Sequence, residues 1–238
     1  MYHDVYNVEP EESGFVSKGA NLYKMKVSLF RDHLKLIKDI APGTILTFDD
    51  GGISFNSFIA SCLEEHGLIG HFYIASNYIG TEGFLTEENI KDLYQRGHII
   101  GAHSASHPEN LDALSLDERK LEWSKSLDRL SEIISAPVEE VSIPNGYYCK
   151  EDIELLSRLG VKTIYTSSIT DYKKLFNASI VGRIALKCDS STTLLESYLT
   201  EGMSYKKALI KQKLLSISKS ILGDKYLSVK RFIRKVIS

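Results

Sequence analysis

The nine residues TILTFDDGG, at positions 44–52, join a short apolar run to two carboxylates and two glycines. The run TILTF is rich in apolar and β-branched residues, which predicts a short buried strand. The two glycines that follow predict that this strand ends in a loop. We therefore expect Asp49 and Asp50 at the C-terminal end of a buried strand.

Helical and strand-like patterns alternate along the chain after this stretch. Helices are predicted at residues 54–66, 86–97, 114–135 and 151–160. Strands are predicted between them at residues 71–75, 98–103, 138–143 and 162–166. This alternation favours an α/β fold with a parallel sheet or barrel, in which reactive loops gather at the C-terminal ends of the strands. Three polar clusters fall at such ends, namely DDGG (49–52), HSASH (103–107) and PNG (144–146).

His103 and His107 are four residues apart in HSASH, so both imidazoles can face one point if the chain curls there. With a carboxylate they make a face of two histidines and one acid, which leaves open positions for water on a bound metal. Taken alone, the pair could be two surface histidines, and Asp-Asp is also common in turns. The occurrence of both features at neighbouring strand ends favours a hydrolytic metal site.

TFDDG at residues 47–51 and GHIIGAHSASH at residues 97–107 closely resemble motifs of the polysaccharide deacetylases of the NodB-homology type, which form a carbohydrate esterase family. The resemblance implies an irregular (β/α)7-type barrel. It also implies that Asp49 is the catalytic base and that a divalent metal, usually zinc, is bound by Asp50, His103 and His107. Non-haem iron for oxygen chemistry is a rival reading of the same face, but such a site does not need a second acid beside the ligand.

The family's third motif, Arg-x-Pro-x-Gly, matches SIPNG at residues 142–146, with Ser142 in place of the arginine. Because the family's arginine orients the base, another residue has to take its place, and Arg183 in VGRIAL is one that could. The residue after the proline offers a backbone N–H to the oxyanion in the family, which implies Asn145, although Pro-Asn-Gly is also an ordinary turn. Tyr148 could line the sugar groove, or it could be a core or surface aromatic residue.

No histidine follows His107, whereas the family normally carries a late histidine as general acid. The opening MYHDV, residues 1–5, resembles the YHxV start of members in which this motif has moved to the N-terminus, including deacetylases of poly-β-1,6-N-acetylglucosamine. The resemblance implies His3 as the general acid, and the alternative is a mobile terminal residue. His33 lies in a predicted amphipathic helix, and we expect it to be structural or exposed.

These motifs predict a metal-dependent hydrolase that removes acetyl groups, most readily the N-acetyl group of a GlcNAc-type sugar in a polysaccharide or glycan precursor. The expected partner is an acetylated carbohydrate, with no nucleic acid. Because the motif arginine is missing, the alternative is a catalytically weak carbohydrate-binding protein on the same fold.

The 238 residues, 43% of them hydrophobic and 25% charged, are typical of a soluble globular protein. Residues 203–238 hold ten Lys and Arg against one acid, a charge of +9, so the total of −2 leaves −11 for the first 202 residues. We expect a deacetylase barrel over residues 1–202 and a basic amphipathic helical tail over residues 203–238, with a break at residues 223–224. Such a tail could contact an anionic membrane or simply be solvated.

The three cysteines are widely separated and form no CxxC pair, so we expect them to be reduced. The N-terminal residues have no basic stretch followed by an apolar one, and no apolar run approaches 18 residues. We therefore expect a cytoplasmic protein, which the tail could hold at the inner face of the membrane.

Overall fold

The structure of the protein is a computed structural model that describes residues 1–169 and 172–222. The chain divides into two compact units after Leu195. The second unit contains the C-terminal helix α8 (Met203–Leu222), and the predicted break at residues 223–224 lies outside the described residues. No described helix has the length and apolar character needed to cross a membrane. The domain boundary at residue 202 stays a prediction.

Seven strands form one sheet in the order β3-β4-β5-β6-β7-β9-β8. Their bounds are β3 (Leu46–Phe48), β4 (Gly70–Ile74), β5 (Ile99–Ala102), β6 (Glu140–Ser142), β7 (Thr163–Thr166), β8 (Tyr172–Leu175) and β9 (Ala178–Gly182). Every neighbouring pair is parallel apart from β8 with β9, which is antiparallel. This topology confirms the predicted irregular α/β barrel.

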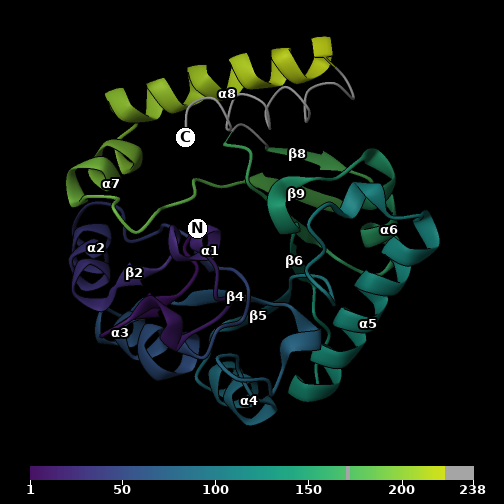
Figure 1. The fold of residues 1–238 in the computed structure, drawn as a ribbon, viewed down its shortest axis with the longest axis horizontal. Coiled ribbons are helices and arrows are strands. Elements are labelled where there is room, and N and C mark those ends of the chain that lie inside the picture. Colours follow the sequence, from purple (N-terminus) through teal and green to yellow (C-terminus); the bar gives the residue numbers. More distant parts are fainter. Residues whose placement is uncertain (170–171, 223–238) are drawn as a thin grey trace. The chain divides into compact units, whose positions relative to one another are not determined.

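The longer helices of the first unit, residues 1–195, surround the strands (Figure 1). This is expected when helices form the connections between parallel strands. These helices are α2 (Val27–Ile40), α3 (Ala60–Glu65), α4 (Glu87–Gln95), α5 (Leu116–Ile134) and α6 (Lys150–Arg158). Helix α7 (Thr192–Leu199) follows the sheet in sequence and contains the boundary between the two units. Shorter elements are β1 (Val5–Tyr6), α1 (Lys18–Asn21), β2 (Met25–Lys26) and the single turns Pro10–Glu12, Ser76–Tyr78, Leu111–Ala113 and Pro144–Gly146. The predicted helix at residues 54–66 begins as a π-helical turn over Phe55–Ile59 and continues as α3.

Aromatic side chains pack against the first strand of the sheet and hold it in place. Phe48, the last residue of β3, lies 5.2 Å from Phe72 and 6.1 Å from Phe55 between ring centroids, and all three side chains are fully buried. Tyr2 also stacks on Phe48, with the ring centroids 5.6 Å apart. The start of the chain is therefore part of the core.

The N-terminal residues also connect the two sides of the barrel. Tyr2 forms a parallel bridge with Phe48, and the Tyr2 N–H donates to the Thr47 carbonyl at 2.8 Å. On its other side, the Leu186 N–H donates to the Met1 carbonyl at 3.0 Å. Because backbone hydrogen bonds hold this segment on both sides, the residue that follows Tyr2 has a defined position.

Candidate metal centre

Four strand ends bring the candidate side chains together. Asp49 and Asp50 directly follow β3, and His103 directly follows β5. Ser142 is the last residue of β6, and Arg183 directly follows β9. Because these strands are parallel, their C-terminal ends meet at one end of the barrel, as the sequence predicted.

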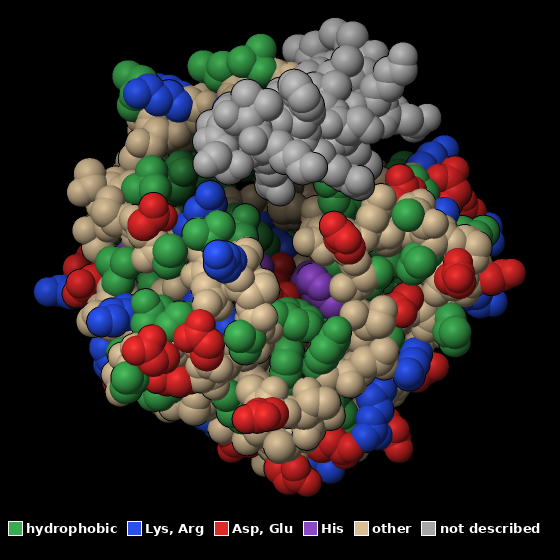
Figure 2. All heavy atoms as spheres, in the orientation of Figure 1, with side chains coloured by type: hydrophobic (Ala, Val, Ile, Leu, Met, Phe, Trp, Pro, Cys, Tyr) green, Lys and Arg blue, Asp and Glu red, His purple; other side chains and the backbone are tan. Residues whose placement is uncertain are grey.

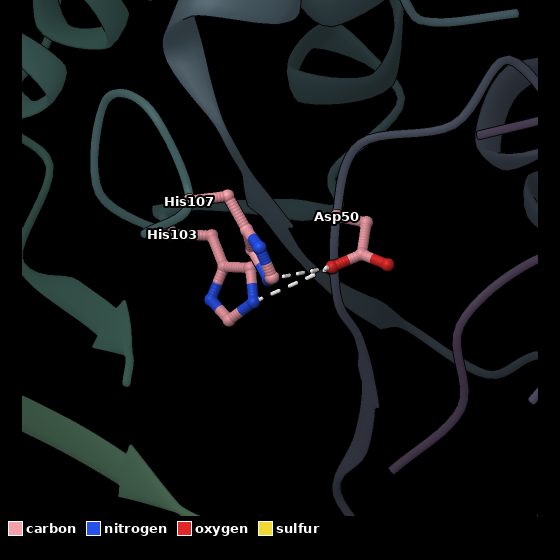
Figure 3. Close-up of side chains that lie close together, drawn as sticks. All are labelled: Asp50, His103 and His107. Carbon is pink, nitrogen blue, oxygen red and sulfur yellow. Dashed lines mark ion pairs between the residues drawn. The ribbon is translucent and has the colours of Figure 1, made fainter. Parts of the chain in front are cut away.

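The proposed metal ligands converge on one carboxylate oxygen. Asp50 Oδ1 lies 3.5 Å from His103 Nε2 and 3.3 Å from His107 Nε2 (Figure 3). One donor atom from each residue lies within 4.8 Å of the other two. Two donors that share a tetrahedral ion at about 2.05 Å lie about 3.3 Å apart, so these separations fit a divalent metal.

Electrostatics and hydrogen bonding prepare the three ligands for a cation. Burial would raise the pKa of Asp50, but the hydrogen bonds with His103 and His107 hold that pKa well below its usual range. Burial would likewise lower the pKa of His107, but the contact with Asp50 raises it above 6.5. His103 Nδ1 lies 2.8 Å from the Ser142 carbonyl, which fixes the proton on Nδ1 and leaves Nε2 free to bind a metal.

The backbone around this site is strained. Among the described residues, few other than glycine have a positive φ, and four of these lie in the loops of the site: Asp50 (90°), Ser104 (60°), His107 (53°) and Asn145 (55°). Such conformations cost of the order of 1–3 kcal/mol each and persist only where the surroundings enforce them. Their concentration at one end of the barrel supports a functional role for these loops.

Asp49 is held by a guanidinium from another strand. Arg183 donates from its two terminal nitrogens to the two oxygens of Asp49, at 2.7 and 2.8 Å. The Ser142 hydroxyl accepts from Arg183 at 2.6 Å and donates to Asp49 at 3.0 Å. Burial works to raise the pKa of Asp49, but Arg183 lowers it to about 2. Asp49 is therefore ionised and fixed in orientation at neutral pH.

The position of Arg183 is itself determined by its surroundings. Its Nε donates to the Thr166 carbonyl at 3.2 Å, and one terminal nitrogen also donates to the Thr47 hydroxyl at 3.2 Å. The guanidinium lies 5.6 Å from the ring centroid of Tyr73 and 5.7 Å from that of Tyr165. Cation–π contacts of this kind stabilise a desolvated guanidinium. They help to offset the cost of burying the charge of Arg183, which is only 7% exposed.

His3 lies beside these groups and is half-buried. Its ring centroid is 4.8 Å from that of Tyr23, and its buried Nδ1 has no hydrogen-bond partner among the described residues. Burial lowers the pKa of His3 below 6.5, although Asp50 and Asp49 act to raise it. The Asp49 N–H donates to the Tyr2 carbonyl at 3.2 Å, so the backbone that leads into His3 lies next to Asp49.

The family model for polysaccharide deacetylases matches residues 39–164, just over half of the chain. The chain belongs to the polysaccharide deacetylase family. The protein also shares its fold with solved deacetylase structures, in agreement with the barrel that the NodB-homology motifs implied. The matched range contains both aspartates and both histidines of the centre, whereas His3 and Arg183 lie outside it.

Individual relatives agree with this assignment. The putative polysaccharide deacetylase YxkH of Bacillus subtilis is 26% identical over 130 residues, 53% of this chain and 46% of the relative. The chain thus spans about half the length of the curated relatives it matches. The Streptococcus pyogenes deacetylase PplD superposes with a TM-score of 0.67 at 20% identity, over 83% of this chain and 95% of PplD. A de-N-acetylase from Aggregatibacter actinomycetemcomitans also gives 0.67, at 15% identity, over 83% of this chain and 97% of its own.

The remaining predicted residues of this family member lie after β6. The side chain of Asn145 is exposed, and its Nδ2 donates to the Pro108 carbonyl at 3.3 Å. Asn145 thereby ties the third-motif loop to the loop that carries His107. Tyr148 is half-buried three residues further on. The substrate-binding roles of both residues stay predictions.

One residue of the site was missed by sequence reasoning. The Phe15 ring centroid lies 5.1 Å from that of His107, next to Tyr78 and Phe84. Phe15 follows an acidic, glycine-containing stretch with no strand or helix pattern, so no sequence signal places it there.

A second group of donor atoms, from Asp112, Cys149 and Asp152, lies between α5 and α6. Arg119 lies among them, with one terminal nitrogen 2.8 Å from Cys149 Sγ and 3.0 Å from Asp152 Oδ1. A fixed guanidinium already neutralises these acids, so this group is an ion-pair cluster that ties the start of α6 to α5.

Proposed function

We propose that this protein is a metal-dependent hydrolase that removes acetyl groups, with the N-acetyl group of a GlcNAc-type sugar as its preferred substrate. The observation that carries the proposal is the placement of an oriented, ionised Asp49 next to the convergent ligands Asp50, His103 and His107. Proteins similar to this chain include a chitin deacetylase and a de-N-acetylase, which supports the N-acetyl assignment.

When bound, a divalent metal, for which we propose zinc, lowers the pKa of water and polarises the acetyl carbonyl. Asp49 would accept the proton of the attacking water. A carboxylate with a pKa of about 2 is a weak base, so Asp49 can act only on water that is already acidified. Arg183 and Ser142 keep the carboxylate in one orientation during this transfer.

The leaving amine must gain a proton when the amide bond breaks. We assign this step to His3, whose lowered pKa makes its imidazolium a stronger acid than an ordinary one. The Asn145 backbone N–H is proposed as a donor to the oxyanion, and Tyr148 as part of the sugar groove. Figure 2 shows histidine and acidic side chains at the base of a hollow, where a substrate could approach them.

Arg183 bears directly on the alternative of a weak carbohydrate-binding protein. That alternative rested on the loss of the motif arginine at position 142. Since a guanidinium from the end of β9 contacts both oxygens of the base, the interaction that the motif provides is present in another form. We therefore favour the enzyme.

The experiment is a measurement of acetate release by the zinc-loaded protein from N-acetylglucosamine oligomers with β-1,4 and β-1,6 linkages, and from O-acetylated sugars. We expect release from the N-acetylated substrates, its loss with a chelator, and its return with added zinc. Binding of the oligomers without any acetate release would establish the binding-protein alternative instead.

We also propose that the basic tail contacts an anionic membrane surface and that the protein acts at the cytoplasmic face. Helix α8 carries Lys206, Lys207, Lys211 and Lys213, with Ile210 and Leu214 exposed. Lysines near an anionic surface contribute about 1 kcal/mol each. Co-sedimentation with vesicles containing phosphatidylserine tests this, and equal sedimentation of a variant lacking residues 203–238 would contradict it.

A further inference from the structure

Four rings pack together at the side of the candidate metal centre. The ring centroid of Phe15 lies 4.7 Å from Tyr78, 5.0 Å from Phe84 and 5.1 Å from His107. Tyr78 and Phe84 stack on each other at 4.9 Å. Phe15 meets both of them edge-on, at interplanar angles of 83° and 73°. This edge-to-face arrangement is a favourable one for aromatic rings and fixes the orientation of Phe15.

The two histidine ligands are oriented by different means. His103 is oriented through its Nδ1, which lies 2.8 Å from the Ser142 carbonyl. His107 is more exposed than His103, with 19% of its side chain accessible against 3%, and it packs on the Phe15 and His103 rings. The ring contacts with Phe15 and His103 therefore help to set the orientation of the His107 ring.

Phe15 belongs to a segment, residues 10–16, that we call the N-terminal strap. Lys24 is 1% exposed, and its ammonium donates to the carbonyls of Pro10 at 2.7 Å and Ser13 at 2.6 Å. The Gly14 N–H donates to the Gly83 carbonyl at 2.8 Å, next to Phe84. Because these bonds fix the backbone just before Phe15, the ring cannot shift freely.

A buried carboxylate connects the strap to the loop that carries Asp50. Asp4 Oδ1 accepts from the Ser13 hydroxyl at 2.6 Å and from the Ser54 hydroxyl at 2.8 Å. A Cβ added to Gly52 would lie 1.8 Å from Asp4 Oδ1, and one added to Gly14 would lie 2.1 Å from Asp4 Oδ2. The two glycines therefore allow the strap and the loop to close around one carboxylate.

We propose that Phe15 is a positioning residue for the metal, which it serves by holding the His107 ring in its ligand orientation, with the strap anchored by Lys24 and Asp4. The inference rests on the proposed metal site. Partners that orient a metal ligand typically change metal affinity by about 10- to 100-fold when they are removed. Phe15 lies outside the matched family region, so this support comes from the N-terminal segment of this chain.

The test is the zinc dissociation constant of the full chain, measured by competition with a chromogenic chelator. Phe15→Ala is expected to weaken zinc binding by about tenfold or more, and Phe15→Tyr, which keeps the ring, to restore most of the affinity. Val16→Ala is the matched control, because Val16 is the neighbouring residue and is 66% exposed. Its zinc affinity should equal that of the wild type.

A second pair of variants separates a specific effect from loss of folding. Lys24→Met should weaken zinc binding in the wild type. It should add little in the Phe15→Ala background, since both changes remove the same support of the His107 ring. Equal zinc affinity in the wild type, Phe15→Ala and Lys24→Met would overturn this inference alone. Failure of the wild type to bind zinc would instead contradict the proposed function. If Phe15→Ala does not fold, Lys24→Met and Phe15→Tyr decide the question by the same criteria.

Discussion

At the scale of single residues, the guanidinium that contacts Asp49 comes from a different sequence position than the family's motif gives. The family's third motif places an arginine at the position of Ser142, whereas here Arg183 reaches Asp49, the proposed base, from the end of β9. Ser142 keeps a smaller part of the role, since its hydroxyl donates to Asp49. The proposed role of Asp49 needs a guanidinium against both carboxylate oxygens, and a guanidinium from either sequence position can meet that need.

Replacing Arg183 by Met should lower kcat by about a hundredfold or more, because the base loses its orientation. Without Arg183, burial dominates and raises the pKa of Asp49, so the acidic limb of the rate profile should move to higher pH. The measurement is kcat/KM against pH for the two proteins, with zinc content determined in each. An unmoved acidic limb would show that Arg183 does not tune Asp49.

Zinc affinity should depend on pH through His107. The metal binds neutral imidazole, whereas Asp50 stabilises the protonated form and raises the pKa of His107 above 6.5. A proton must therefore leave on binding, and below that pKa the affinity should fall by about tenfold per pH unit. Zinc titrations at pH 6, 7 and 8 measure this effect. Equal dissociation constants at all three values would mean that His107 is not a ligand.

At the scale of elements, the sequence predicted what hydrophobic patterns control. Helix α2 and the buried strands β3 to β7 were expected because their apolar residues face a core. The β8–β9 hairpin was not, because β8 contains Tyr172, which is 84% exposed, and two lysines, so it lacks an alternating pattern. The N-terminal strap was missed because Asp4 and Lys24, charged residues that are usually exposed, are buried here.

Asp4 gives the strap a testable pH dependence. Burial raises the pKa of Asp4 to about 6. Its contribution to stability is therefore present in full below about pH 4, the unfolded value, and is lost as the pH rises through 6. Asp4→Asn removes this titration, so its stability relative to the wild type should increase between pH 4 and 7 in urea unfolding. A constant difference across that range would contradict the assignment.

Asp4→Ala, which removes the polar side chain altogether, should lower the stability of the folded chain. Asp4→Ala leaves the buried hydroxyls of Ser13 and Ser54 without their acceptor, which costs about 1–3 kcal/mol for each unsatisfied group. We expect a lower free energy of unfolding at pH 7 than in the wild type, measured with urea. A variant as stable as the wild type would show that the strap does not depend on this carboxylate.

At the scale of the whole molecule, the site is assembled from segments far apart in sequence. The motifs predicted Asp49, Asp50, His103 and His107 because they lie in short patterns at strand ends, and the structure brings these residues together. His3 could be proposed only by resemblance, and Phe15 not at all, since their positions depend on how the first 26 residues pack onto the barrel. That packing uses buried polar bonds, which leave no periodic signal in a sequence.

A metal that joins β3 to the loop after β5 should stabilise the folded chain. At a hundredfold excess over its dissociation constant, zinc would add about 2.7 kcal/mol. For a protein of this size we expect a rise in Tm of roughly 5–10 °C, lost on adding a chelator. Asp50→Ala is the control and should show no response to either. A zinc response of equal size in Asp50→Ala would place the metal elsewhere.

The most direct test compares the wild type with Asp49→Asn for both zinc content and acetate release from an N-acetylglucosamine oligomer. The amide introduced by this substitution keeps the shape of the carboxylate but cannot accept the proton, whereas Asp50, His103 and His107 remain intact. We predict one zinc ion per chain in both proteins and acetate release by the wild type alone. Equal acetate release by the two proteins, or none from a zinc-loaded wild type, would contradict the account.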